Sequence, residues 1–465
     1  MTTPLFTLDA ILDATGGRAE GVEAREINSI SIDSRELGPD ALFVAIKGDR
    51  FDGHDFVDAA LANGAVAALV SEGCSAGPGR IFVADALGGL RDLGRAARAR
   101  SRALIVGVTG SVGKTTTKEA LRVVFEAAGQ THASIKSFNN HWGVPLMLAR
   151  MPANTQFGVF EMGMNAPEEI RPLSQMVRPH VAVITSIAPV HLEGLGSIEA
   201  IARAKAEIFS GVEPGGTAII NADHGQLPLL LDAAAAANIG NVITYGFARG
   251  VDWQILDPQS SAERSSAKVQ HLDRHCDLDL PIAGRHMLAN ATAALAAAHV
   301  AGIRPEDALR ALAGLRAQAG RGQQVLLGPV DTPLLLVNES YNANPVAVVA
   351  ALSVFAAIEP RGGRKVLVLG DMRELGAEAD ALHAGLADAV RESGAERVHL
   401  VGQHMAALAS ALPAGLVTSH AQTAEQAEDV IVADLAYGDA IMIKGSNGVG
   451  LARIVSAIVA RFEQT

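Results

Sequence analysis

Short apolar runs of strand length alternate with longer amphipathic stretches along most of the chain. From residue 103 onward the alternation is regular. It predicts strands in ALIVGVTG, QFGVFEMG, VAVITSI, TAIINAD and NVITYGF, and helices in KTTTKEALRVVFEAAG and SIEAIARAKAEIF. These strand runs are apolar at nearly every position, which is typical of parallel strands that helices cover on both faces. The pattern therefore indicates an α/β protein built on parallel sheets.

The same alternation divides the 465 residues into three parts, as a length of roughly 100 to 200 residues per domain suggests. Residues 1–102 carry short strand and helix signals and end in the arginine-rich helical stretch DLGRAARARSRA. Residues 103–318 contain the regular alternation, lose the helical signal at 251–280, where we expect hairpins, and end at the polar stretch AQAGRGQQ. In residues 319–465 the alternation restarts. We predict a small N-terminal domain, a central domain with a parallel nucleotide-binding sheet and a C-terminal Rossmann-like, doubly wound domain.

Composition and charge exclude several classes of protein. Hydrophobic residues make up 49% of the chain and charged residues 19%, which is typical of a folded protein rather than a disordered one. The formal net charge is −12, and no basic stripe of the kind that binds nucleic acid is present. No run approaches the ~20 apolar residues of a membrane helix, and the first residues lack the basic start of a secretory signal. We therefore expect a cytoplasmic monomer with no nucleic-acid partner and no membrane insertion.

The strongest local signal is VGVTGSVGKTTTKE at 106–119, between a predicted strand and a predicted helix. In such a loop, backbone N–H groups point at a phosphate, a lysine reaches the terminal phosphates, and the following hydroxyl binds Mg²⁺. Val108 stands where the common pattern has its first glycine, so the loop is a variant. No guanine-specific NKxD sequence is apparent, so ATP is favoured over GTP. The alternative to a phosphate loop is a chance glycine-rich turn. The residues expected to bind ATP here are Thr109, Gly110, Ser111, Val112, Gly113, Lys114, Thr115 and Thr116.

This loop, TGSVGKT, resembles that of the Mur ligases and folylpolyglutamate synthetases, which form amide bonds through an acyl phosphate. Further segments resemble Mur ligase motifs in the family's order: FNNHWGVP, VFEMGMN, IAPVHLEGLGS, RAKAEIF, GRHMLANATAA, GRGQ, ESYNANP, LGDMRELG and IKGSNG. ESYNANP and GDMRELG are most similar to the branch that adds D-alanyl-D-alanine to UDP-N-acetylmuramoyl-tripeptide. The DNPR-like segment of the branch that adds the third residue is absent from the sequence. The resemblance implies an ATP-dependent, ADP-forming peptide ligase of peptidoglycan precursor synthesis.

The resemblance also implies a metal site next to the phosphate loop. Thr115 and Glu161 would hold one Mg²⁺, and Glu161 also ends a predicted strand, where doubly wound sheets bind ligands. His191 would hold a second Mg²⁺, and Lys205 would carry a carbamate that acts as a further metal ligand. Lys114, which would reach the γ-phosphate, is then catalytic together with His191 and Lys205. On residue type alone, a surface carboxylate, a structural loop histidine and a helix-surface lysine remain the alternatives.

Contacts to the substrates follow from the same resemblance. Asn290 would contact the adenine, Arg321 would close on the nucleotide from the third domain, and Glu339 would lie near the ribose. Asn338 stands where many relatives have Asp, which leaves Glu339 as the carboxylate at this position. The UDP end is assigned to Ser34, Arg35 and Lys47, with plain surface charge as the alternative for Arg35 and Lys47. The other substrate contacts are assigned to Asn139, Asn140, Tyr341, Asn342, Asn344, Lys444 and Ser446, of which the residues of ESYNANP would meet the dipeptide.

Two other functions remain open at this point. One is another Mur-type ligase or a folylpolyglutamate synthetase, although the latter usually has a GKGS-like loop where this chain has Lys114 followed by three threonines. The other is an NTP-dependent regulatory or transport ATPase, which would not need His191, Lys205 and a linked third domain. ADP release that depends on the added amino acid or dipeptide would separate these functions.

Overall fold

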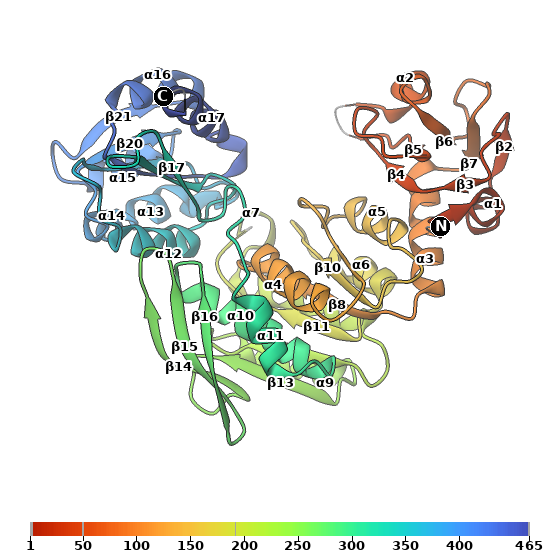
Figure 1. Cartoon of the computed structure of the whole chain (residues 1–465), viewed down its shortest axis with the longest axis horizontal. Helices are drawn as coiled ribbons and strands as arrows, with labels where there is room; N and C mark the ends of the chain where they lie inside the picture. The colour runs from red at the N-terminus through yellow and green to blue at the C-terminus, as the bar shows by residue number, and fades with distance from the viewer. Residues whose placement is uncertain (1–2, 49–50, 191, 464–465) are drawn as a thin grey trace.

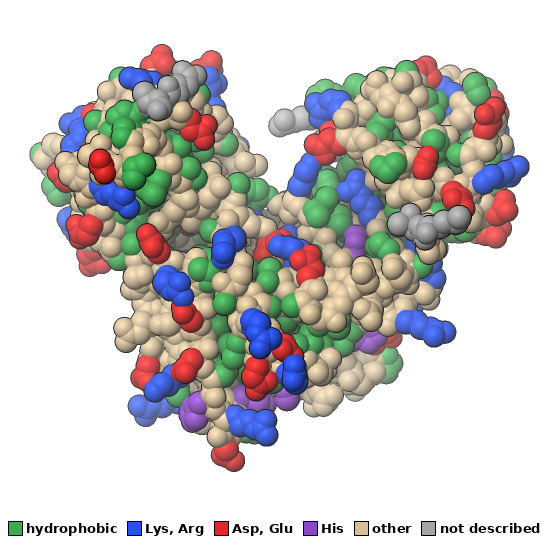
Figure 2. All heavy atoms as spheres, in the orientation of Figure 1, with side chains coloured by type: hydrophobic (Ala, Val, Ile, Leu, Met, Phe, Trp, Pro, Cys, Tyr) green, Lys and Arg blue, Asp and Glu red, His purple; other side chains and the backbone are tan. Residues whose placement is uncertain are grey.

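The computed structural model describes residues 3–48, 51–190 and 192–463. Sheets of five, nine and six strands follow one another along the chain, beside a two-stranded pair of β1 (Phe6–Thr7) and β3 (Glu26–Ile27). Figure 1 shows two outer bodies above a central one, and Figure 2 shows the hollow that separates the outer bodies. The predicted α/β class with parallel sheets is confirmed. Within these described ranges no helix is long and apolar enough to cross a membrane.

The N-terminal sheet has the strand order β2-β7-β6-β5-β4, in which β2 alone runs antiparallel to its neighbour. Leu42, Leu69 and Ile81 from three adjacent strands pack in one core with Leu90 and Leu93 of α3, the predicted arginine-rich helix. The elements are β2 (Arg18–Glu20), β4 (Ser29–Ser31), β5 (Ala41–Val44), β6 (Ala65–Ser71), β7 (Arg80–Val83), α1 (Leu8–Thr15), η1 (Gly53–Phe56), α2 (Val57–Ala62) and α3 (Ala86–Arg100).

The central sheet has the order β16-β15-β14-β13-β12-β11-β8-β10-β9. The seven strands from β8 to β14 run parallel to one another. Strands β14, β15 and β16 form the antiparallel hairpins predicted at 251–280. The strands are β8 (Leu104–Thr109), β9 (Thr131–Ala133), β10 (Phe157–Glu161), β11 (Val181–Ile184), β12 (Thr217–Asn221), β13 (Asn241–Gly246), β14 (Trp253–Ser260), β15 (Ser265–His271) and β16 (Arg274–Leu280). The helices are α4 (Lys114–Glu126), α5 (Gly143–Ala149), α6 (Ile170–Val177), α7 (Leu192–Leu195), α8 (Ile198–Ala206), η2 (Glu207–Gly211), α9 (Leu227–Ala236), α10 (Arg285–Val300) and α11 (Pro305–Leu312).

Side chains of β8 point alternately into two cores, one on each face of the central sheet. Val106 and Val108 pack with Phe125 of α4 and with α10, whereas Ile105 packs on the other face with Leu173 of α6. Both faces are therefore covered, which explains why the strand is apolar at nearly every position. The parallel strands bring their carboxyl ends to one edge of the sheet, where ligands bind in such folds.

The C-terminal sheet has the order β17-β18-β22-β19-β20-β21, and β17 alone is antiparallel. Leu367 and Met442 face one core, and Val366 and Ile443 face the other, so this sheet is also covered on both sides. The strands are β17 (Gln323–Leu327), β18 (Leu334–Glu339), β19 (Lys365–Gly370), β20 (Arg397–Val401), β21 (Val417–Ala421) and β22 (Ala440–Lys444). The helices are α12 (Pro345–Ala356), η3 (Gly376–Glu378), α13 (Ala379–Ala384), α14 (Ala387–Glu392), α15 (Met405–Ala411), α16 (Ala424–Asp434), η4 (Asn447–Val449) and α17 (Ala452–Phe462).

A buried cation of α3 joins the N-terminal helix to the central body. Arg98 is 4% exposed and donates from Nε to the carbonyl oxygen of Val177 at 2.7 Å and from Nη2 to that of Arg178 at 2.8 Å. Glu213 lies 3.3 Å from Nη2. The two carbonyls end α6, where the helix itself offers them no N–H partner. Arg98 therefore satisfies the end of one helix from another.

We expect Arg98→Met to lower the free energy of unfolding by about 1–3 kcal/mol, because the carbonyl of Val177 would stay buried without its donor and the carbonyl of Arg178 would also lose one. Arg95→Met, on the exposed side of the same helix, should change it by less than about 0.5 kcal/mol. Urea unfolding followed by the fluorescence of Trp142 and Trp253 would compare the two variants. Equal midpoints would contradict the role of Arg98.

Candidate functional site

The phosphate loop joins β8 to α4 and has room only for glycine at two positions. Gly110 has a φ of 150° and Gly113 a φ of 90°. A Cβ at Gly110 would overlap Oγ1 of Thr185, and a Cβ at Gly113 would lie 2.5 Å from Oδ1 of Asn290. The loop is therefore packed against the end of β11 and the first turns of α10, and the predicted adenine contact Asn290 lies beside it. Thr116 is the third residue of α4.

The segment after β11 holds the backbone of this loop. The N–H of Ser111 donates to the carbonyl oxygen of Ser186 at 2.8 Å, and the hydroxyl of Ser111 donates to that of Ala188 at 3.1 Å. The N–H of Val112 donates to Oγ of Ser186 at 3.1 Å, and Oγ1 of Thr185 donates to the carbonyl oxygen of Val112 at 2.6 Å. These bonds fix the loop in one conformation ahead of the helix.

Lys114 is the first residue of α4 and bends back over the loop. Its Nζ donates to the carbonyl oxygen of Gly110 at 2.8 Å. Desolvation lowers the pKa of Lys114; the carboxylate of Glu161 opposes this shift, and the positive charge of Arg321 adds to it. Since Arg321 comes from the C-terminal part of the chain, two cations from different bodies act on the same place. Such a place favours an anionic ligand.

The two predicted ligands of the first Mg²⁺ are brought together by the fold. Glu161, which ends β10 and is 2% exposed, accepts a hydrogen bond from Oγ1 of Thr115 at 2.9 Å on Oε2. Its Oε1 accepts another from Nδ2 of Asn139 at 2.8 Å, so this predicted substrate contact lies at the candidate metal ligands. His191, the predicted ligand of a second Mg²⁺, lies outside the described residues.

Lys205 on α8 is fully buried. Among the residues that the structure describes, its Nζ has no hydrogen-bond partner. Burial first, and then the positive charge of Lys114, hold the pKa of Lys205 well below its usual range, while Glu207 opposes the shift. Buried polar atoms almost always have a partner. The unpartnered amine therefore points to a group that the chain itself does not supply.

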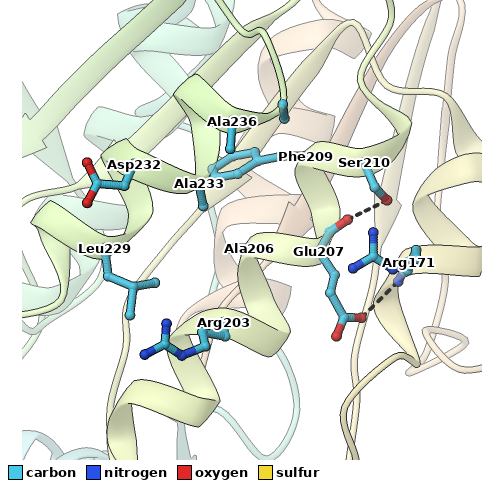
Figure 3. A pocket seen from close by; sticks show the side chains of 11 residues that line it. Arg171, Arg203, Ala206, Glu207, Phe209, Ser210, Leu229, Asp232, Ala233 and Ala236 are labelled. Carbon is cyan, nitrogen blue, oxygen red and sulfur yellow. Dashed lines mark hydrogen bonds between the residues drawn. The ribbon is translucent and has the colours of Figure 1, made fainter.

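Glu207 anchors the end of α8 to the start of α6. Its carboxylate accepts hydrogen bonds from the backbone N–H groups of Glu168, Ile170 and Arg171 at 2.7, 3.1 and 3.0 Å, of which Figure 3 shows the last. An open cavity of about 800 Å³ lies on this side of α8, and Lys205 does not line it. Glu207 thereby fixes the backbone next to Lys205 from the opposite side of the helix.

Glu339 and Lys444 end the adjacent parallel strands β18 and β22 and form a partly buried ion pair. Nζ of Lys444, which is 3% exposed, lies 3.0 Å from Oε2 of Glu339 and also donates to the carbonyl oxygen of Asn342 at 3.1 Å. Its charge is therefore largely satisfied within the protein. Asn338 stands where many relatives have an Asp carboxylate. Its Oδ1 accepts hydrogen bonds from the N–H and the hydroxyl of Ser340, so it bonds within its own segment.

Three other predicted substrate residues bond to nearby backbone. Asn344 is the N-cap of α12 and accepts from the N–H of Ala347 at 2.9 Å. Asn140 accepts from the N–H of Gly143 at 2.9 Å, at the start of α5. Ser446 donates to the carbonyl oxygen of Ala343 at 3.4 Å. These side chains position the ends of helices around the cleft.

Segment 134–139 contacts all three bodies. Lys136 forms an ion pair of 2.6 Å with Glu36 of the N-terminal body, and the hydroxyl of Ser137 contacts that of Tyr341 in the C-terminal body. Arg321 in turn stacks on the Tyr341 ring, 4.1 Å from its centroid. Asn139, the last residue of the segment, donates to the candidate metal ligand Glu161. The segment therefore links the candidate metal site to both outer bodies.

The three residues predicted for the UDP end lie together. Ser34 and Arg35 follow β4, and Lys47 follows β5, so all three lie beyond the carboxyl ends of adjacent parallel strands. Arg35 bonds to Asp33 through Nε at 2.9 Å and Nη2 at 2.8 Å, and this pairing lowers the pKa of Asp33 to about 2. Within this group, Arg35 is therefore already paired, and Lys47 is an exposed cation.

Sequence reasoning missed two parts of the site. Lys118, buried in α4, donates to the carbonyl oxygen of Ser134 at 2.7 Å, and Oγ of Ser134 accepts from the N–H of Glu161 at 3.3 Å. A lysine just after the phosphate loop in TTTKE was the available signal. The second part is a cavity of about 1050 Å³ between α7 and the GDMRELG loop, lined in part by Arg373. An arginine just beyond the strand run RKVLVLGD was the signal for it.

The fold and the site define a class of enzymes in which a phosphate loop on a parallel sheet faces a second, doubly wound domain. The chain belongs to the Mur ligase family. The description "Mur ligase family, catalytic domain" matches residues 26–80, "Mur ligase middle domain" matches 108–298 and "Mur ligase, glutamate ligase domain" matches 320–447.

Relatives match nearly the whole chain. It is 35% identical to the UDP-N-acetylmuramoyl-tripeptide–D-alanyl-D-alanine ligase of Bacillus subtilis, over 94% of both chains. It is 33% identical to the ligase of the same name from Escherichia coli, over 97% of this chain and 98% of that one. Among solved structures, MurF from Acinetobacter baumannii has a TM-score of 0.85 and 29% identity, over 98% of this chain and 99% of the other. MurF from Thermotoga maritima, solved with ADP, has a TM-score of 0.78 and 25% identity, over 94% and 98%.

We expect Gly110→Ala to weaken ATP binding by more than about tenfold, because the new Cβ would overlap Thr185 and the backbone conformation suits only glycine. Gly225→Ala is the matched control, since a Cβ there meets nothing within 4 Å. Calorimetric titration with a non-hydrolysable ATP analogue and Mg²⁺ measures both. Unchanged affinity in a folded Gly110→Ala variant would contradict the tight packing of the loop.

Proposed function

We propose that this chain is the ADP-forming ligase that joins D-alanyl-D-alanine to UDP-N-acetylmuramoyl-tripeptide. The observation that carries the proposal is the buried amine of Lys205, unpartnered among the described residues, in a domain where Thr115 meets Glu161 next to a phosphate loop. A regulatory or transport ATPase has no use for such an amine. The two curated relatives with this activity in their names align over 94% and 98% of their length.

The residues fit ATP and Mg²⁺. Gly110 and Gly113 have the positive φ angles of a glycine-dependent turn at the start of a helix, as a phosphate loop requires, and Thr115 and Glu161 offer the oxygen ligands that Mg²⁺ prefers. When bound, Mg²⁺ would neutralise the negative charge that phosphoryl transfer to a carboxylate brings together. The γ-phosphate is assigned to Lys114, and the remaining nucleotide contacts to Asn290, Arg321 and Glu339.

The reaction has two steps. A carboxylate oxygen of the tripeptide attacks the γ-phosphorus of ATP, the bond to the bridging oxygen breaks, and ADP leaves an acyl phosphate behind. The amine of D-alanyl-D-alanine then attacks the acyl carbon, phosphate leaves, and the amine nitrogen gives up a proton. Lys114 and Arg321 stabilise the negative charge on the phosphoryl oxygens throughout.

Lys205 fits the role of a carbamate. Its neutral Nζ attacks CO₂, an N–C bond forms and one proton leaves, so a potential cation becomes an anion. An ammonium group about 4 Å from another unit cation would be repelled by about 4 kcal/mol at an effective dielectric of about 20. A carbamate reverses this sign and offers two oxygens to Mg²⁺. The lowered pKa of Lys205 supports the reaction, because only the neutral amine reacts.

The substrates extend to both outer bodies. We assign the UDP end to Ser34, Arg35 and Lys47, and the dipeptide to the cavity beside the GDMRELG loop. Arg373 lines this cavity and has no ion pair among the described residues, whereas Lys444 is already paired. Arg373 is therefore the cation proposed for the dipeptide carboxylate. We also assign Tyr341, Asn342, Asn344 and Ser446 to the dipeptide; of these, Ser446 accepts from the N–H of Arg373 at 3.0 Å.

We further propose domain limits near residues 102 and 318. The first central strand begins at Leu104, and the first C-terminal strand begins at Gln323. A monomer suffices for the reaction, because all three domains of one chain contribute residues to the cleft. We place the enzyme in the cytoplasm, where ATP is available.

ADP release with each substrate omitted in turn tests the proposed function. We expect release only when UDP-N-acetylmuramoyl-tripeptide, D-alanyl-D-alanine, ATP and Mg²⁺ are all present, and we expect one amide product per ADP. Glutamate and a diamino acid, each with its matching precursor, serve as controls for other ligases of this type. ADP release that ignores the added dipeptide would favour the ATPase alternative.

We expect Lys205→Ala to be inactive and to regain part of its activity when short-chain carboxylic acids are added, since these can place a carboxylate in the vacated space. Lys205→Arg should be inactive and should not respond, because its bulk fills that space and its guanidinium stays charged. The assay is ADP release with and without acetate or propionate. Full activity of the alanine variant would remove the carbamate role.

A further inference from the structure

A fully buried histidine lies behind the GDMRELG loop and bonds to its backbone. His383 of α13 is 0% exposed, and its Nε2 accepts a hydrogen bond from the N–H of Met372 at 2.9 Å. Its Nδ1 lies 2.6 Å from the carbonyl oxygen of Ala379. Because a carbonyl oxygen can only accept, Nδ1 carries the ring proton and Nε2 is a bare acceptor. Burial also lowers the pKa of His383, so the ring is held neutral in one tautomer.

Three successive residues of the loop, Asp371, Met372 and Arg373, are each held by hydrogen bonds to other segments. The carboxylate of Asp371 accepts from the backbone N–H groups of His404 and Met405 at 3.3 and 3.0 Å. Met372 donates to His383, as described above. The N–H of Arg373 donates to Oγ of Ser446 at 3.0 Å. The direction in which the Arg373 side chain leaves the backbone is therefore set by bonds at its own residue and at the residue before it.

We propose that His383 is a positioning residue that, through the N–H of Met372, sets the place of Arg373 in the cavity and thereby the affinity for the incoming dipeptide. This inference rests on the proposed ligase function, in which Arg373 meets the dipeptide carboxylate. His383 does not line the cavity, so it acts only through the loop. The phosphate loop lies in another body and does not depend on this bond.

Two substitutions separate the two bonds of the ring. His383→Gln can place an amide oxygen near the position of Nε2, where it accepts from Met372. His383→Asn has a shorter side chain whose amide reaches the position of Nδ1, where it donates to Ala379 and leaves the N–H of Met372 buried without an acceptor. The first variant keeps the bond to the loop, and the second loses it.

We expect the KM for D-alanyl-D-alanine to rise about tenfold or more in His383→Asn, as the loss of one buried hydrogen-bond partner implies. In His383→Gln the same KM should stay within about threefold of the wild type, and the KM for ATP should stay within about twofold in both variants. A general loss of stability would not raise one KM alone. A dipeptide KM that is unchanged in His383→Asn would overturn the proposal.

His399 is the matched control. It is equally buried in the same domain and bonds through both nitrogens, to Ser419 at 2.7 Å and to Asp434 at 3.1 Å, but neither partner lines the cavity. We expect His399→Asn to lower the midpoint of thermal unfolding and to leave the dipeptide KM unchanged. If it raises that KM as much as His383→Asn does, the effect is general loosening and the proposal is wrong.

Two measurements on the wild-type protein separate this proposal from the proposed function. If the wild type shows no dipeptide-dependent ADP release, both the ligase function and this inference are wrong. If the wild type is active and His383→Asn has an unchanged KM for the dipeptide, only the role of His383 is wrong. Long-range ¹H–¹⁵N correlation spectra of the wild type give the tautomer of His383. They therefore test the proposal even if the His383→Asn variant does not fold. A proton on Nδ1 supports the proposal, and a proton on Nε2 overturns it, because Met372 would then have no acceptor.

Discussion

Positive charge gathered at the carboxyl ends of the central strands is the constraint on which the rest of this structure depends. Burial and then the charge of Lys114 lower the pKa of Lys205, and burial together with the charge of Arg321 lowers the pKa of Lys114. Each cation makes the others less favourable where water is excluded. Glu161 offsets only part of this charge, since it is a single carboxylate that acts on Lys114 against Arg321. The arrangement is therefore built for anionic groups, which a triphosphate and a carbamate would supply.

The C-terminal body meets this charged centre through short, specific contacts, whereas α3 of the N-terminal body also shares a core with Leu146 and Ala149 of α5. Lys136 reaches Glu36 on one side, and Ser137 reaches Tyr341 on the other. Both belong to segment 134–139, which also meets the candidate metal ligands. Contacts of this size can break and re-form while each sheet keeps its own core. The hollow in Figure 2 can then admit a long substrate that spans the bodies.

Much of the fold follows from the sequence because the parallel strands are buried on both faces, as the alternation of Ile105 and Val106 between two cores shows. The pattern gave no strand at β17, an antiparallel edge strand that begins with Gln323 and Gln324 in the stretch assigned to a domain boundary. The motifs predicted that Thr115 and Glu161 lie at one site, and the two side chains do contact each other. Their role as Mg²⁺ ligands stays a prediction. The bond between His383 and Met372 was beyond the sequence, because no local pattern states which backbone N–H a distant side chain will accept.

The central claim is that the amine of Lys205, which has no hydrogen-bond partner within residues 3–48, 51–190 and 192–463, becomes an anion when CO₂ is available. The most direct measurement is a ¹³C NMR spectrum of the Mg²⁺-loaded protein in ¹³C-labelled bicarbonate, with Lys205→Ala as the reference. The account predicts one carbamate signal in the wild type that is missing from the variant. Identical spectra, together with an Nζ of Lys205 that titrates near the ordinary lysine value of 10.5, would contradict it.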